Sequence, residues 1–168
     1  MTEPRPGDIG LTKIGGLAGA FVNVGQWFVG DFAPVQHALV YVGNGMVVQA
    51  MPSGAEMIPL EKASPVVMWS TDLIDLTPVD RLYISENAID LVGTPYSFLD
   101  YLSIALERLG VHSKLIRERV MSSGHLICSQ LCVLAYERAG IDLFPGQFPG
   151  DQTPGDLYHL LKELETNA

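Results

Sequence analysis

The chain has 168 residues, of which 48% are hydrophobic and 17% charged. This composition excludes an intrinsically disordered chain, and the length suits one domain with its own core, so we predict a single domain over residues 1–168. The net charge of −9 argues against nucleic acid as a partner, because phosphate binding needs a basic surface. A local basic cluster is interpreted as a solvated helix face; it consists of Arg108, Lys114, Arg117 and Arg119.

The start of the chain does not have the pattern of a signal peptide. Glu3 and two prolines replace the basic start and the apolar run. The longest uncharged stretch, residues 14–30, contains five glycines as well as Asn23 and Gln26, and is too short and too polar for a membrane span. We therefore expect a soluble protein that is made in the cytoplasm and has no stable membrane span.

The first half of the chain favours β-strands. Residues 7–13 are a short extended segment, whereas residues 14–30 fit either a helix or a close-packed loop. Residues 35–42 and 46–51 are rich in β-branched and aromatic residues and flank a glycine–asparagine turn, which predicts a β-hairpin. Two further strands are predicted, at 56–60 and 66–76.

The second half favours helices. The pattern predicts them over residues 78–92, 97–109 and 126–139, each followed by a glycine that can end a helix. A last helix begins at Thr153, with Pro154 in its first turn. Strands followed by helices predict an α+β fold, in which an antiparallel sheet is covered on one face by helices.

Cys128 is the candidate nucleophile. It lies at the start of a predicted helix, where backbone N–H groups are unpaired and the helix dipole is positive, and both favour the reactive thiolate. Cys132, one turn later, has the apolar neighbours typical of a buried cysteine. A disulfide within one helical turn is geometrically poor, and two cysteines give no zinc-ribbon spacing, so no metal or cofactor is predicted.

A cysteine nucleophile needs a base, and the chain has four histidines. His159 lies on a face of the last helix, and His112 lies in a polar linker. His125 is close to the cysteine in sequence, but at a helix start the two side chains need not meet. His37 lies in a predicted strand, which is a rigid platform for a base, so we predict His37 in that role.

The hairpin register decides whether Gln49 can orient His37. A two-residue turn pairs Val40 with Gln49 and puts Gln49 on the face opposite to His37. A three-residue loop over 43–45 pairs Leu39 with Gln49 and puts both side chains on one face. The glutamine oxygen can then accept the imidazole N–H and fix its tautomer. The alternative is that Gln49 is an ordinary exposed strand residue.

Five short motifs carry a resemblance to a known superfamily. In chain order they are Gly7-Asp8-Ile9-Gly10, residues 36–45, Val48-Gln49-Ala50, Gly93-Thr94-Pro95-Tyr96 and Ile127-Cys128-Ser129. Together they resemble the circularly permuted branch of the NlpC-type papain-like superfamily, which includes relatives of lecithin:retinol acyltransferase. The resemblance implies a papain-like α+β fold in which the histidine strand precedes the cysteine helix.

The resemblance also implies roles for single residues. Cys128 is the nucleophile, His37 the general base and acid, and Gln49 the orienting third residue, where relatives more often have His or Glu. Tyr96 matches a tyrosine beside the catalytic cleft that can contact substrate; the alternative is a core aromatic residue. Asp8 matches a recurrent residue with a structural role.

The activity implied is that of a cysteine amidase or peptidase, with a peptidoglycan peptide as substrate and no cofactor. A phage tail or lysis component, or a protein exported by a route without a signal peptide, fits that substrate. Two alternatives stay open. One is an acyltransferase or lipid hydrolase, in which residues 14–30 line an acyl pocket or touch a membrane. The other is a catalytically silent module that binds phage structural proteins.

Overall fold

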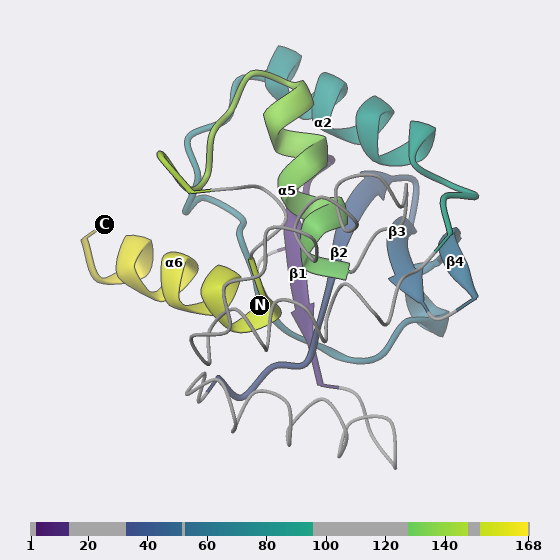
Figure 1. The fold of residues 1–168 in the computed structure, drawn as a ribbon, viewed down its shortest axis with the longest axis horizontal. Helices are drawn as coiled ribbons and strands as arrows, with labels where there is room; N and C mark the ends of the chain where they lie inside the picture. Colours follow the sequence, from purple (N-terminus) through teal and green to yellow (C-terminus); the bar gives the residue numbers. More distant parts are fainter. Residues whose placement is uncertain (1–2, 14–32, 52, 96–127, 148–151, 168) are drawn as a thin grey trace, which may run out of the picture.

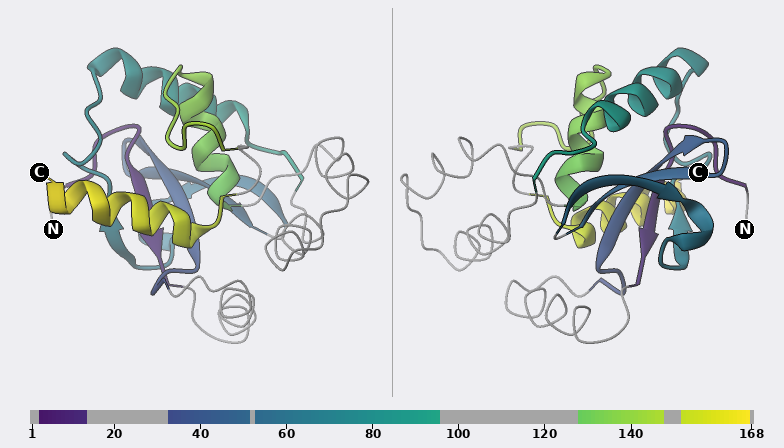
Figure 2. Two further views of the ribbon diagram at one scale, coloured as in Figure 1. Left: turned by 60° about the vertical axis from the view of Figure 1, so that its left-hand side comes forward. Right: turned by 90° about the vertical axis from the view of Figure 1, so that its right-hand side faces the viewer.

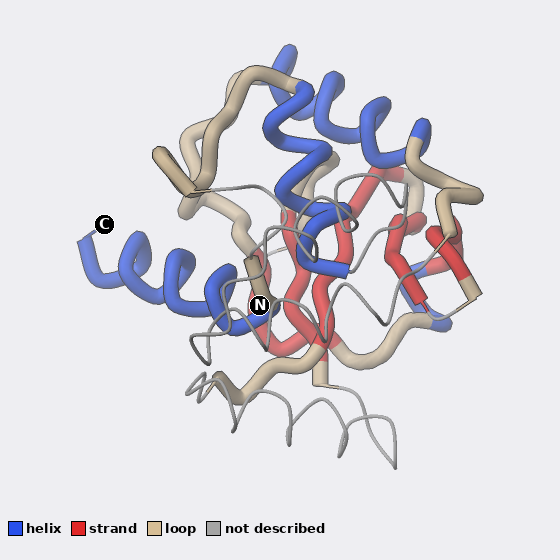
Figure 3. The backbone as a smooth tube through the Cα atoms, viewed as in Figure 1, coloured by secondary structure: helices blue, strands red, loops and turns tan. Residues whose placement is uncertain are grey.

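A computed structural model of the chain describes residues 3–13, 33–51, 53–95, 128–147 and 152–167. The described strands form a five-stranded antiparallel sheet in the order β4-β3-β2-β1-β5 (Figure 1). The strands are β1 (Ile9–Thr12), β2 (His37–Gly43), β3 (Met46–Met51), β4 (Gly54–Pro59) and β5 (Val66–Trp69). Figure 3 shows these strands side by side, with the helices arranged around them. The predicted α+β class and antiparallel sheet are confirmed.

The described helices follow the sheet in the chain, apart from a single 3-10 turn, η1 (Leu60–Lys62). They are α2 (Pro78–Asp90), α5 (Cys128–Arg138) and α6 (Pro154–Asn167). Figure 2 shows from two further directions that α5 runs beside α2, and α5 also packs on β2 and β3. None of the described helices has the length and apolar character that crossing a membrane requires.

Capping residues that the sequence predicts are present at the start of α6 and after α5, and α2 begins with a capping box that was not predicted. Thr77 and Asp80 form a reciprocal capping box at the start of α2, with Asp80 N bonded to Thr77 Oγ1 at 3.2 Å. Thr153 and Asp156 make the same exchange at α6. Gly140, at φ 83°, follows α5 in the left-handed conformation that glycine adopts readily.

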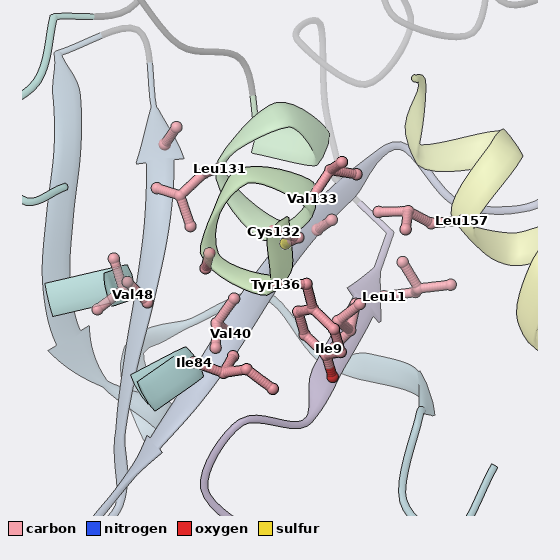
Figure 4. Packing of buried hydrophobic residues seen from close by; sticks show 14 of the residues in the cluster. Ile9, Leu11, Val40, Val48, Ile84, Leu131, Cys132, Val133, Tyr136 and Leu157 are labelled. Carbon is pink, nitrogen blue, oxygen red and sulfur yellow. The ribbon is translucent and has the colours of Figure 1, made fainter. Parts of the chain in front are cut away.

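One face of the sheet and the three helices share a hydrophobic core. Alternate residues of β1 and β2 point into it, because side chains alternate between the two faces of a strand. Ile9 pairs with Val40 and Leu11 with Ala38, and all four belong to the core. Leu131 and Tyr136 of α5 fill the centre, and α2 and α6 add apolar side chains at the sides (Figure 4). The core-facing members labelled in Figure 4 are Ile9, Leu11, Val40, Val48, Ile84, Leu131, Cys132, Val133, Tyr136 and Leu157.

The β2–β3 hairpin closes with a two-residue turn. Asn44 and Gly45 have φ angles of 52° and 71°, and Gly43 pairs with Met46 on either side of them. Two central residues with positive φ are typical of a type I′ turn, whose twist matches that of paired strands. Of the two loop lengths that the sequence left open, the two-residue turn is the one present, and on its own it would separate Gln49 from His37.

A β-bulge between Tyr41 and Gly43 restores the register that a three-residue loop was expected to give. Beyond the bulge Leu39 pairs with Gln49. Gly43 has a φ of 95°, a backbone conformation that side chains disfavour, so a glycine suits the bulge. Leu39 therefore pairs with Gln49, as is required for Gln49 and His37 to share a face. The bulge produces this pairing, and the loop length does not.

The predicted strand over 66–76 is wrong in its second half, because β5 covers only the first four residues. The chain turns at Ser70, whose carbonyl accepts a hydrogen bond from Leu73 N at 3.0 Å, and Asp72 has a φ of 62°. Ser70 Oγ also accepts a hydrogen bond from Ile9 N at 2.8 Å. These hydrogen bonds of Ser70 turn the chain, so β5 ends at Trp69 and does not continue to residue 76.

The other predicted strands begin or end within about two residues of the observed ones, and the remaining predicted segments lie outside the described residues. The strand predicted at 35–42 begins at His37, the one predicted at 56–60 begins at Gly54, and the one at 46–51 is confirmed. The segment 14–30, the helix predicted over 97–109 and the basic cluster lie outside the described residues.

Residues 7–10 contact α5 at one end and the neighbouring strands at the other. Gly7 O accepts a hydrogen bond from Tyr136 Oη at 2.6 Å, so the end of α5 is attached to the start of β1. Gly10 lies beneath the side chains of Trp69 and Leu39; a Cβ added there would be 2.6 Å from the Trp69 ring. Gly10 is on the face of the sheet opposite to the hydrophobic core, because its neighbours Ile9 and Leu11 face the core. The close packing on that opposite face requires glycine at position 10.

Asp8 holds α2 against the sheet through a buried ion pair. Its carboxylate is fully buried and accepts a hydrogen bond from Arg81 Nη1 at 2.7 Å. Thr71 Oγ1 and Arg5 N donate to the other carboxylate oxygen at 2.7 and 2.8 Å. The structural role expected of Asp8 agrees with these contacts.

Replacing Arg81 by alanine is expected to lower the free energy of unfolding by about 3–5 kcal/mol, because it leaves the Asp8 carboxylate buried without its counter-charge. Urea denaturation followed by tryptophan fluorescence measures the loss. Lys162→Ala is the matched control, since it breaks an exposed pair with Glu165 and should change the stability little. Equal losses in the two variants would contradict the role given to Asp8.

Candidate functional site

Cys128 is the first residue of α5, and its side chain lies over the start of β2. The residue is 6% exposed. Backbone N–H groups of Ala38 and Ser129 donate hydrogen bonds to the sulfur, and the side chain is also hydrogen-bonded to His37. The predicted position at the helix start therefore gives the sulfur three hydrogen-bond partners from two elements.

His37 is the first residue of β2 and connects the sulfur to the sheet. It is 4% exposed. Its Nε2 lies 2.9 Å from Gln49 Oε1. A glutamine oxygen can only accept, so His37 Nε2 carries a proton and donates it to this bond. The other ring nitrogen, Nδ1, is then left for the hydrogen bond with Cys128.

Gln49 is held on its other side by Glu56, a residue that the sequence analysis missed. Gln49 Nε2 donates to Glu56 Oε1 at 3.0 Å. The two residues are directly opposed in the β3–β4 pairing, so their side chains leave the same face of the sheet. The sequence predicts two consecutive strands, at 46–51 and 56–60, that contain these residues. It does not predict the register between the two strands, so the pairing of Gln49 with Glu56 was not foreseen.

The charges of the pair follow from these contacts. Burial on its own lowers the pKa of His37, but attraction to Cys128 and hydrogen bonds with Cys128 and Gln49 raise that pKa above the ordinary value of 6.5. Burial on its own raises the pKa of Cys128, but attraction to His37 and its hydrogen bonds lower it below 9.0. Both shifts favour a thiolate beside an imidazolium.

Cys132 lies one helical turn further along α5 and behaves differently. It is fully buried within the hydrophobic core, where Figure 4 shows its sulfur among apolar side chains. Burial, together with the charge of Cys128, raises the pKa of Cys132 well above 9.0. The prediction that Cys132 is an apolar core residue is confirmed, and it gives the chain an internal control for Cys128.

Of the remaining candidate residues, the structure describes His159. His159 is exposed on α6, as expected, with its ring beside that of Tyr158. Tyr96, His112 and His125 lie outside the described residues, so their predicted positions stay predictions.

Two buried polar side chains near the site have no hydrogen-bond partner in the part of the chain that the structure describes. One is Thr12, which pairs directly with His37 across β1 and β2. The other is Gln152, whose backbone carbonyl accepts a hydrogen bond from Ser129 Oγ at 2.7 Å, next to Cys128. Their spare hydrogen-bonding capacity lies beside two of the site residues, and no pattern in the sequence indicates either one.

Among the described residues, no group of three or more His, Cys, Asp or Glu side chains is arranged to hold a metal ion. Comparisons of the chain with protein-family models, with curated proteins and with solved structures gave no significant match.

The charge state of the pair predicts how Cys128 reacts with iodoacetamide. In a Cys132→Ala background, the alkylation rate should fall less between pH 8 and pH 6.5 than that of an unperturbed thiol, because the lowered pKa keeps more of the sulfur ionised. His37→Ala should slow the reaction at pH 7 by at least about tenfold, since burial without the imidazolium raises the thiol pKa. Mass spectrometry at a series of pH values measures both rates.

N-acetylcysteine in the same buffers is the reference for an unperturbed thiol. A profile for Cys128 that follows this reference, or one that His37→Ala leaves in place, would contradict the ion pair.

Proposed function

We propose that the chain is a cysteine hydrolase that cleaves an amide bond with Cys128 as nucleophile, His37 as general base and acid, and Gln49 as orienting residue. The observation that carries the proposal is the continuous hydrogen-bonded series from the sulfur through the imidazole to the carboxamide. Nucleophile, base and orienting group in that order are the arrangement that covalent catalysis by cysteine requires.

The charge state supports the same roles. The sulfur is activated before a substrate arrives, because both pKa shifts favour the thiolate–imidazolium form. The imidazolium is then already protonated for the next step. No separate event is needed to move a proton from sulfur to nitrogen.

In the proposed reaction the Cys128 thiolate attacks the amide carbon, and the carbonyl electron pair moves to oxygen. As the tetrahedral intermediate collapses, the C–N bond breaks and the His37 imidazolium gives its proton to the leaving amine. The thioester left on Cys128 is attacked by water, which gives a proton to the neutral His37. The carboxylic acid leaves, and the thiolate–imidazolium pair is restored.

The start of α5 supports stabilisation of the oxyanion. Cys128 is its first residue, so the backbone N–H of Cys128 lies among the N–H groups that have no partner within a helix. We assign that N–H to the oxyanion site, where the positive end of the helix dipole favours developing negative charge.

We also propose that the fold is papain-like and circularly permuted. The supporting observations are that the histidine strand β2 precedes the cysteine helix α5 in the chain, and that α5 packs on β2 and β3. By analogy with the superfamily that the sequence resembles, the substrate is a peptidoglycan peptide, and the setting is a phage tail or lysis component, or an exported protein.

Purified peptidoglycan peptides test the proposal. The chain is expected to release free amines from them and to form a thioester on Cys128, detected as an added acyl mass after acid quenching. Cys128→Ala should lower the rate by at least about a thousandfold, because the other described cysteine, Cys132, is buried in the hydrophobic core and cannot replace the nucleophile. Cys132→Ala, which alters the same helix one turn away, should retain the activity.

Parallel assays separate the alternatives. Acyl transfer from lipid vesicles without amine release would favour the acyltransferase or lipid hydrolase. An absence of both reactions, with Cys128 alkylated no faster than a free thiol, would favour the catalytically silent module.

A further inference from the structure

We propose that Glu56 is a positioning residue that acts on His37 through Gln49: it holds the carboxamide so that the oxygen faces the imidazole. The proposal rests on the proposed function, because it gives Glu56 a part in the same site. It extends that site from three residues to four, across three neighbouring strands and one helix.

The acceptor on the far side of the Gln49 carboxamide fixes the orientation of that group. A glutamine amide turned by 180° exchanges its oxygen and its NH₂ group in almost the same space. The Glu56 carboxylate is an acceptor, so it requires the NH₂ group of Gln49 on its side, as the 3.0 Å bond from Nε2 to Oε1 shows. The oxygen is thereby directed to His37, at 2.9 Å from Nε2.

The orientation of the carboxamide in turn sets the tautomer of the His37 imidazole. With the glutamine oxygen facing it, His37 Nε2 has to carry a proton, and Nδ1 is left for the sulfur. If the amide were turned, its NH₂ group would require Nε2 as an acceptor. A neutral imidazole would then carry its proton on Nδ1, towards the sulfur, and could not accept the thiol proton there.

Glu56 is held by a strand whose backbone is hydrogen-bonded on both sides. It lies directly opposite Gln49 in the β3–β4 pairing. The neighbouring Ala55 is attached on its other side to the segment after α2, with Ala55 N bonded to Thr94 O and Gly93 N bonded to Ala55 O, each at 2.8 Å. β4 is therefore fixed on both sides at this point, and the carboxylate is carried by a rigid support.

The charge of Glu56 acts in the same direction. Cys128, from α5, and Glu56, from β4, are the charged groups that favour the protonated form of His37 in the described part of the chain; Gln49 and Thr12, from β3 and β1, are neutral. The negative charge of Glu56 raises the pKa of His37 and so supports the thiolate beside it.

Glu56→Gln tests the inference with almost no change in shape, in the Cys132→Ala background. It removes the charge and allows the Gln49 amide to turn. The alkylation rate of Cys128 by iodoacetamide at pH 6.5 is expected to fall roughly 3- to 10-fold, and the midpoint of the pH profile to rise by about half to one unit. The thermal midpoint should change little, which separates positioning from a loss of folding.

Glu61→Gln is the matched control, because it changes the net charge equally at an exposed residue of η1. It should leave the pH profile unchanged. A second test combines Glu56→Gln with Gln49→Ala. If Glu56 acts through Gln49, its further effect in that background should fall below about twofold.

Three results would overturn the inference: an unchanged profile in Glu56→Gln, an equal shift in Glu61→Gln, or an undiminished effect of Glu56→Gln when Gln49 is already alanine. Because alkylation needs no substrate, these outcomes are separate from hydrolysis. A wild-type chain that hydrolyses peptides while Glu56→Gln keeps the original profile refutes the role of Glu56 alone. A shifted profile without any hydrolysis refutes the proposed function alone.

Discussion

The register between β2 and β3 is the constraint on which the candidate site depends. Side chains alternate along a strand, so a shift of one residue would move Gln49 to the opposite face of the sheet from His37. The turn at Asn44 and Gly45 would produce that shift by itself, and the bulge before Gly43 reverses it. An irregularity of one residue in the hairpin thus decides whether the imidazole has Gln49 as a hydrogen-bond partner.

Burial of the site has a cost that the contacts offset. Cys128 and His37 are both largely removed from water, and burial alone would keep the thiol protonated and the imidazole neutral. Each group instead favours the charged form of the other, and backbone N–H groups add to this at the sulfur. Cys132, on the same helix, shows the result without an imidazole partner, because burial and the charge of Cys128 raise its pKa.

The rest of the fold fixes the distance between the two halves of the site. α5 carries the cysteine, and its other end is attached to the start of β1 by the bond from Tyr136 to Gly7. The Asp8–Arg81 pair holds α2 against the same part of the sheet. Because α2 and α5 pack on each other and on β2, the helix start cannot move relative to His37 without disturbing the core.

The sequence by itself determined the features that depend on neighbouring residues. Periodicity and turn residues gave the α+β order, the hairpin, the capped helices and the contrast between Cys128 and Cys132, because these follow from local backbone preferences and apolar spacing. Only the tertiary structure decided the bulge, the end of β5 at Trp69 and the contact of Gln49 with Glu56. Each of these results from pairing between strands, where a hydrogen bond from a distant segment outweighs the local preference.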